Sequence, residues 1–308
     1  MLLPLIFILS TSICFGAFSL IRKKYQEYNG SGLLSTVIFV VFYTLFEIAI
    51  SLLISLCFSQ INQLSNITPL TVTVAAIFSA TSFISTIICI IGTAYGSLPI
   101  LMMFATLGSI AISSTYDIIL GQAQITNRYI AALLFIAVIL IINIINDKKS
   151  ANESKKSSFI FKLLCVVVFF TNGVGLVFYH IFAINNPVFG NFNFIALYSA
   201  FGLIIALIAL VFLCTARRKN NSFSAIIKIN WKSYLLILLY SILLCVSEAL
   251  ALNTTSIIPV SIHSPLSFAI SLVFVTIFDS IFYKTKPNKL QLVQMGAAVL
   301  SAILISMN

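Results

Sequence analysis

Two acidic residues, Glu248 and Glu47, lie deep inside long apolar stretches of the sequence. An ionisable side chain in a membrane-spanning helix costs roughly 2.5–3.5 kcal/mol on insertion scales, so such residues are candidates for function. Loss of water disfavours the charged form of a carboxylate. Glu248 could therefore take up a proton, or it could hold the ammonium group of a solute. A structural carboxylate that accepts hydrogen bonds from a neighbouring helix is the alternative for both residues.

Polar side chains that could bind a solute accompany these carboxylates. Tyr43 precedes Glu47 by four residues, a spacing that places both on one face of a helix and could form one wall of a cavity. Asn172 could hydrogen-bond a solute, and Tyr179 lies seven residues later on roughly the same face. His180 follows near the end of its apolar segment, where a place at the membrane interface is the simpler interpretation.

A third group of polar residues forms a stripe in which His263, Ser267 and Ser271 recur every fourth residue. Pro265 lies within this stripe and interrupts the backbone hydrogen bonds of a helix, which frees carbonyl groups that a cavity could use. Serines at this spacing also permit close helix packing. The stripe is therefore compatible with a binding surface and with a packing surface.

A comparable stripe of Ser109, Ser113 and Asp117 lies in an earlier apolar segment, and Asp117 is a candidate for binding a proton or solute. Asp279 lies close to Lys284 near the end of another apolar segment. An ion pair at the membrane interface is the simpler role for Asp279.

Several kinds of chemistry are not indicated by the sequence. Neither histidine has a further metal ligand three or four residues away, and the six cysteines form no C-x-x-C pair, so no metal site and no cofactor is predicted. The sequence contains neither a G-x-S-x-G motif nor a Walker A motif. We therefore do not expect an enzyme or an ATP-driven pump.

The composition is that of a protein that faces lipid. Of its 308 residues, 60% are hydrophobic and only 8% are charged, and the mean hydropathy is +1.13. Soluble domains carry about a quarter charged residues. The apolar runs are continuous and long enough for helices that cross a hydrocarbon core of about 30 Å, whereas a barrel would show alternation. The first run has no basic residues before it and no cleavage pattern, which predicts a retained helix.

The sequence therefore predicts an all-α integral membrane protein with about ten transmembrane helices. They are expected at residues 2–21, 33–58, 70–92, 98–120, 129–146, 159–184, 193–214, 233–254, 257–283 and 289–306. A charged stretch at 147–158 divides the chain into a first repeat, 1–146, and a second repeat, 159–308. Each repeat contains five helices, an odd number, so the second would be inverted relative to the first. Transporters often have this plan, with the solute site where the repeats meet.

The two halves share landmarks that support a duplication. Pro259 follows Pro99 at an offset of 160 residues, and Gly173 follows Gly16 at an offset of 157 residues. Each proline opens the fourth helix of its half, and each glycine lies in the first.

The net charge of the chain is +10, and the positions of its basic residues indicate the topology. Sixteen of the 17 lysines and arginines fall in four segments after the first, fifth, seventh and ninth expected helices, and Arg128 alone lies on the other side. The positive-inside rule then makes the basic loops cytoplasmic and both termini external. We expect a multi-pass protein of the cell or inner membrane. Binding of nucleic acid is not needed to explain the charge.

The chain resembles the drug/metabolite transporter superfamily, in particular its ten-helix EamA-type branch. Phe15-Gly16-Ala17-Phe18 is similar to the aromatic-Gly-x-x-aromatic element of that family's first helix, and Asn172-Gly173 lies at the matching point of the sixth. The stretches 121–126 and 283–288 are similar to the short polar segments before its fifth and tenth helices. Phe15 and Gln122 stand where the family usually has Trp and Glu.

This resemblance implies a ten-helix transporter of metabolites such as amino acids, amines or drugs, with export the commoner direction. It also implies peripheral fifth and tenth helices whose apolar faces could form a homodimer.

From the residues we expect a secondary transporter that moves a small polar, zwitterionic or cationic metabolite or drug by alternating access, driven by a gradient of protons or of a solute. Lysine and arginine are absent from the interior of every expected helix, which argues against an anionic solute. A channel or a lipid-translocating protein is the main alternative, and an intramembrane enzyme is the least favoured.

Overall fold

The computed structural model describes most of the chain and consists of helices. It covers residues 2–30, 32–92, 95, 98–121, 126–127, 130–131, 134, 155–216, 230–283 and 289–306. No strand occurs among these residues.

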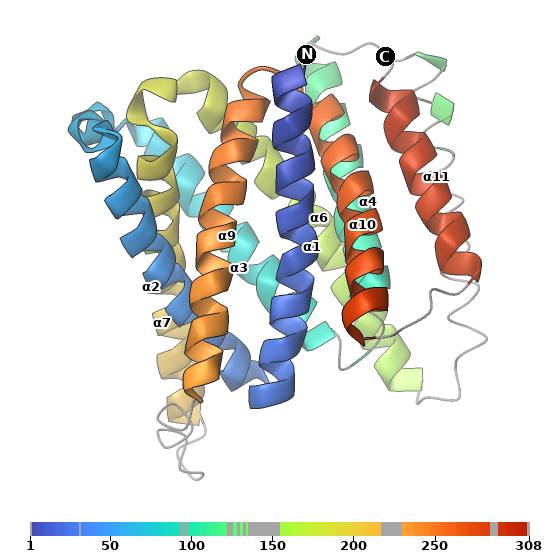
Figure 1. Cartoon of the computed structure of the whole chain (residues 1–308), viewed down its shortest axis with the longest axis horizontal. Helices are drawn as coiled ribbons and strands as arrows, with labels where there is room; N and C mark the ends of the chain where they lie inside the picture. The colour runs from blue at the N-terminus through green and yellow to red at the C-terminus, as the bar shows by residue number, and fades with distance from the viewer. Residues whose placement is uncertain are drawn as a thin grey trace.

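The described residues form nine α-helices and two short 3-10 helices. They are α1 (Leu2–Asn29), α2 (Leu33–Cys57), η1 (Gln60–Asn66), α3 (Pro69–Gly92), α4 (Leu98–Ile119), α6 (Lys155–Asn185), η2 (Pro187–Phe189), α7 (Asn191–Ala216), α9 (Trp231–Thr255), α10 (Val260–Tyr283) and α11 (Lys289–Ser306). The long helices stand side by side in a bundle, and both termini lie at the same end of it (Figure 1).

Among the helices of the described residues, six are long and apolar enough to cross a membrane: α1, α2, α3, α6, α7 and α9. Their length and composition agree with the predicted multi-pass, all-helical membrane protein. The expected helix at 129–146 and the linker at 147–158 lie largely outside the described residues.

Two predicted boundaries differ markedly from the structure. Helix α6 begins at Lys155, within the expected linker 147–158 and before the expected helix start at 159. The first helix was expected to end at residue 21, yet α1 continues to Asn29. Its apolar face continues beyond the most hydrophobic stretch, because Ile21 and Tyr25 are buried against other helices. The helix ends at Gly30, which has a φ of 77° and donates its N–H to the carbonyl of Gln26 at 2.7 Å. Arg22, Lys23 and Lys24 therefore lie within a helix.

Helices α1 and α6 have similar surroundings in the bundle, because each packs mainly against two other long helices. Helix α1 packs against α9 and α10, whereas α6 packs against α3 and α4. Helix α2 contacts α7 and α9, α3 contacts α7, α4 contacts α10, and α11 lies against α10.

Two hydrogen bonds fix the relative directions of α1 and α6. Gln26 near the end of α1 donates to the carbonyl of Ile90 at the end of α3, at 3.1 Å. Asn186, just after α6, donates to the carbonyl of Asn66 before α3 begins, at 3.2 Å. The two helices therefore finish at opposite ends of α3 and run in opposite directions.

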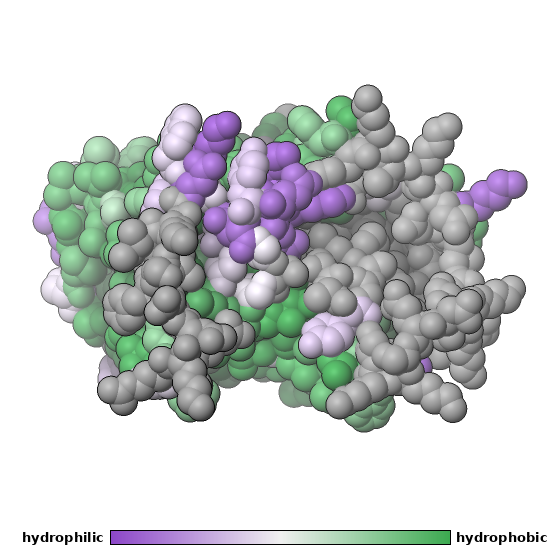
Figure 2. Space-filling model, turned by 90° about the horizontal axis from the view of Figure 1, so that it is seen from below, coloured by the Kyte–Doolittle hydropathy of each residue, from purple (hydrophilic) through white to green (hydrophobic). Residues whose placement is uncertain are grey.

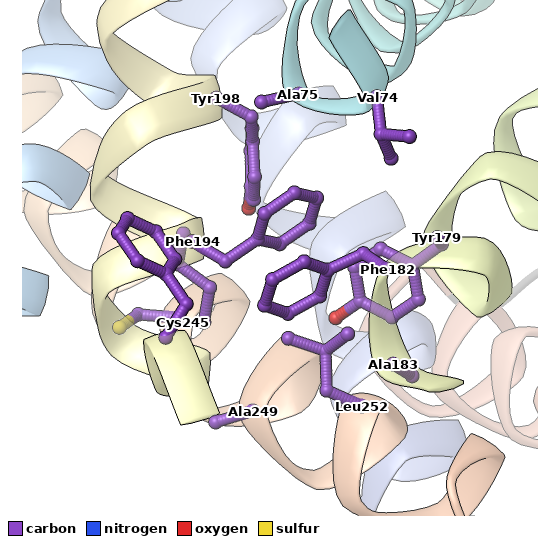
Figure 3. Packing of buried hydrophobic residues seen from close by; sticks show 12 residues of the cluster. Val74, Ala75, Tyr179, Phe182, Ala183, Phe194, Tyr198, Cys245, Ala249 and Leu252 are labelled. Carbon is purple, nitrogen blue, oxygen red and sulfur yellow. The ribbon is translucent and has the colours of Figure 1, made fainter. Parts of the chain in front are cut away.

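A hydrophobic cluster fills the end of the bundle where α6 ends and α7 begins (Figure 3). Phe182 and Phe194 stack there with ring centroids 3.7 Å apart, and Leu252 of α9 and Val74 of α3 complete the packing. At the opposite end, one cluster joins α1, α2, α3, α7 and α9, and another joins α3, α4 and α6. Hydrophobic clusters therefore contribute to the packing of the bundle at both ends.

The closest helix approach is between α4 and α6. A Cβ atom on Gly108 would lie 1.8 Å from the carbonyl oxygen of Phe169, and one on Gly173 would lie 2.5 Å from the carbonyl oxygen of Gly108. Small residues at such contacts let two backbones touch, which is how many helices associate in membranes.

We expect Gly108→Ala to lower the thermal stability of the purified protein, because the added methyl group would force two backbones apart. Overpacking of this kind costs about 1–3 kcal/mol. Gly296→Ala is the matched control, since nothing lies within 4 Å of the position its Cβ would occupy. Equal melting temperatures for the two variants would contradict the close approach of α4 and α6.

Candidate functional site

A central cavity of about 190 Å³ lies mainly between α1, α3, α6, α9 and α10, with one lining residue each from α2 and α4. Helix α1 lines it with Thr11, Phe15, Phe18, Arg22 and Gln26, which recur every three or four residues on one face. At 1.5 Å per residue, the cavity follows α1 for about 22 Å.

Six of the eight residues predicted to bind a solute or proton line this cavity. They are Glu248, Tyr43, His263, Ser267, Asn172 and Tyr179. They come from both halves of the chain, and only the packing of four helices brings them together.

Glu248 on α9 is half-buried in the wall of the cavity. Its Oε2 atom is buried and has no hydrogen-bond partner among the described residues. The Tyr179 hydroxyl donates to the backbone carbonyl of Glu248 at 2.5 Å, which ties α6 to α9 at this level. The carboxylate itself is left available to a ligand.

His263 and Ser264, at the start of α10, are also buried in the cavity wall. Neither imidazole nitrogen of His263 nor the hydroxyl of Ser264 has a hydrogen-bond partner in the described part of the chain. Unsatisfied buried polar atoms are rare in proteins and call for an explanation. A ligand in the cavity would supply the missing partners.

The serine stripe of α10 both reaches the cavity and packs against a neighbouring helix. Ser267 lines the cavity, and its carbonyl oxygen accepts bonds from Ser12 of α1 at 2.9 Å and from Ser271 at 2.6 Å. The first bond joins α1 to α10. The hydroxyl of Ser271 is thus satisfied by the backbone, as expected of a packing residue.

Asn172 holds α6 against α3. Its side-chain amide donates to the hydroxyl of Ser85 at 3.0 Å and to the carbonyl of Val168 at 3.3 Å. Both Asn172 and Ser85 line the cavity, so this bond also sets the position of one wall.

Glu47 lies beside the central cavity rather than in its wall. It is fully buried and accepts hydrogen bonds from Tyr198 at 3.1 Å and from Ser199 at 2.8 Å. Glu47 borders a second cavity of about 10 Å³, which Tyr43 and Glu248 also line. This space matches about one water molecule. The two carboxylates thus face a common small space.

Asp117 is buried but belongs to neither of these two cavities. In the same stripe, Ser113 donates to the carbonyl of Ser109 at 2.5 Å, and Ser109 donates to that of Ala105 at 3.0 Å. These bonds within α4 indicate packing for the two serines. His180 is buried, with 2% of its surface exposed, and it also lies outside both cavities.

The polar cavity residues that the sequence analysis missed include Arg22, Lys23 and Gln26. They were assigned to a loop because the first helix was ended too early. The apolar face that continues through Ile21 and Tyr25 was the signal that could have placed them. A cationic side chain therefore does line the cavity, which corrects the argument against an anionic solute.

The end of the bundle at which α1 finishes is seen in Figure 2, where hydrophilic side chains gather between green apolar regions. Lys23 and Gln26 belong to this end and are only half-buried. Since both also line the cavity, the cavity extends towards this end of the molecule.

Comparisons with known proteins identify the fold alone. No family model matches the sequence, and no curated protein matches it. A solved structure described as "Crystal structure of protein" superimposes with a TM-score of 0.66 and aligns over 98% of this chain and 96% of its own. The two sequences are 13% identical. The whole bundle, including both halves, thus has a counterpart of known structure.

In a cysteine-free background, we expect Ser85→Cys to react with a small hydrophilic thiol reagent at least roughly tenfold faster than Ser51→Cys, because reactivity requires access. Both serines are buried, but only Ser85 lines the central cavity. Labelling rates measured by mass spectrometry test this expectation. Equal protection of both cysteines would show that solutes cannot reach the cavity.

Proposed function

We propose that this protein is a secondary transporter that binds a small polar solute in the central cavity and moves it across the membrane by alternating access. The observation that carries the proposal is the convergence of Glu248, His263 and Ser264 on one cavity, each with polar atoms that no described residue satisfies. In a protein that faces lipid, such groups mark a solute or ion pathway.

The packing supports two inverted repeats of five helices. Exchanging α1 with α6, α2 with α7, α3 with α9 and α4 with α10 leaves the α2–α7 and α4–α10 contacts unchanged and converts the α2–α9 contact into the α7–α3 contact. The α10–α11 contact has no counterpart among the described residues. The α1–α9 contact becomes α6–α3, and the α1–α10 contact becomes α6–α4. The opposite directions of α1 and α6 agree with inversion.

The two landmark glycines agree with the same exchange. A Cβ atom on Gly16 of α1 would meet Phe274 and Phe278 of α10, whereas one on Gly173 of α6 would meet Gly108 and Ile112 of α4. Corresponding glycines thus lie at corresponding contacts, as expected of a duplicated chain (residues 1–146 and 159–308) in which the halves rock against each other around a site at their interface.

The proposed assignment is the EamA-type branch of the drug/metabolite transporter superfamily, on the residues that carry the resemblance. Under the positive-inside rule the basic end is cytoplasmic. The cavity then extends from the middle of the bundle towards the cytoplasm, and the aromatic cluster around Phe182 and Phe194 closes the external end. A closed external end favours a carrier over an open channel.

The solute is best sought by thermal stabilisation of the purified protein. A ligand that binds only the folded protein raises its stability in proportion to RT ln(1 + [L]/Kd), so weak binding is detected at millimolar concentration. The panel comprises amino acids, amines, nucleosides, sugars and cationic drugs. A solute that stabilises the protein becomes the substrate for transport in proteoliposomes.

We expect Glu248→Gln to abolish transport driven by a proton gradient while the protein stays folded, because the amide cannot exchange a proton. Uptake at several pH values, beside the melting temperature, measures this effect. Glu27→Gln is the matched control, since Glu27 is exposed and pairs with Lys24 outside the cavity. Unchanged uptake and an unchanged pH profile in Glu248→Gln would exclude the proton-coupling role.

We also expect both termini to be external. A C-terminal fusion to a reporter that is active only outside the cytoplasm should give signal, and the same reporter placed after residue 150 should not. Activity of a cytoplasm-specific reporter at the C-terminus would reverse the proposed orientation.

A further inference from the structure

Arg22 carries a positive charge into the cavity wall without an acidic partner among the described residues. Its Nη2 atom donates to the hydroxyl of Tyr240, and its guanidinium carbon lies 5.3 Å from the centre of that ring. Its Nε atom is buried and has no hydrogen-bond partner among the described residues. The nearest carboxylate in sequence, Glu27, pairs with Lys24 instead, at 2.7 Å.

This arrangement leaves most of the hydrogen-bonding capacity of Arg22 unused. A guanidinium has five N–H donors in a rigid fork, which matches the paired oxygens of a carboxylate or phosphate. The hydroxyl of Tyr240 accepts a hydrogen bond from one of these donors and so fixes the plane of the guanidinium. Arg22 is half-buried and its Nε atom is shielded from solvent. A charge that loses solvent without gaining a counter-ion is unfavourable, so an anion would be preferred at this position.

The opposite pole of the cavity is acidic. Glu248 lies eight residues beyond Tyr240 on α9, a separation of about 12 Å along the helix axis. Arg22, Glu248 and Glu47 all belong to the described part of the chain. Arg22 forms no ion pair with either glutamate. The cavity therefore presents a cation at one level and a carboxylate, with His263, at another.

We propose that Arg22, oriented by Tyr240, is the subsite for an anionic oxygen group of the transported solute, a carboxylate or a phosphate. This inference rests on the proposed transport function and narrows its substrate class. The solute carries an anionic group at the basic end of the cavity and a cationic or hydrogen-bond-donating group at the level of Glu248. Purely cationic drugs would leave Arg22 unpaired and are poor substrates.

The guanidinium of Arg22 can be observed directly by nitrogen-15 NMR, because the chain has only four arginines: Arg22, Arg128, Arg217 and Arg218. The full-length protein, labelled at arginine in phosphatidylcholine nanodiscs, is titrated with acetate, with inorganic phosphate and with chloride at matched ionic strength. Loss of one signal in Arg22→Gln assigns it. If that variant does not fold, Tyr240→Phe assigns the signal by shifting it alone.

We expect acetate or phosphate to move the Arg22 signal saturably, while chloride and the other three arginine signals show no saturable change. A larger response to acetate identifies a carboxylate group, and a larger response to phosphate identifies a phosphate group. Tyr240→Phe should weaken the response several-fold. Lys24→Gln, which removes a neighbouring charge outside the cavity, should leave the response intact.

Two results would overturn the subsite. One is an Arg22 signal that responds equally to acetate, phosphate and chloride. The other is a signal that ignores acetate and phosphate but moves when phosphatidylglycerol replaces phosphatidylcholine, since the anion would then be a lipid headgroup. Saturable binding without any transport would contradict the proposed function and leave the subsite standing. Transport without an anion-dependent shift of the Arg22 signal would overturn the subsite and leave the proposed transport function standing.

Discussion

Lipid cannot form hydrogen bonds, and every polar group of a membrane-spanning helix must therefore find a partner inside the protein or face a cavity. Most polar side chains of this bundle meet the first condition. The hydroxyls of Ser109, Ser113 and Ser271 donate hydrogen bonds to carbonyl groups of their own helices. The hydroxyl of Ser12 donates to a carbonyl group of α10. Four residues with a buried polar atom that no described residue satisfies line one central space: Arg22, Glu248, His263 and Ser264. Ser114 and His180 also have such atoms but lie outside that space. The position of that space follows from the crossing of α1 and α6 with their neighbours.

Glu47 and Glu248 are the same type of residue, but their positions in the bundle give them different hydrogen-bond partners. Glu47 is held by two hydroxyls of α7, and this supports a structural role with access to one small side cavity. Glu248 has a buried oxygen without such a partner and borders both cavities. A proton that reaches Glu248 from the central cavity could therefore be shared with Glu47 across the small one.

Much of the fold could be predicted because hydropathy is a local property. The expected segments 33–58, 70–92 and 98–120 differ from α2, α3 and α4 by at most one residue at either end. Six candidate residues, including Glu248 and His263, also reach one cavity, because lipid makes isolated polar residues conspicuous in a sequence. The partners of Glu47 could not be predicted, since Tyr198 and Ser199 lie about 150 residues away and only tertiary packing brings them close. Arg22 was misplaced because helix ends depend on packing beyond the apolar run, which hydropathy alone does not record.

The central claim is that the cavity binds a solute and is exposed to the two sides of the membrane in turn. Counterflow tests it most directly. Proteoliposomes are loaded with an excess of the unlabelled solute that stabilises the protein, and labelled solute is then added outside. A carrier with one alternating site predicts transient accumulation of label above its equilibrium level, with saturation at high concentration. Simple equilibration without overshoot or saturation would contradict alternating access and indicate a channel.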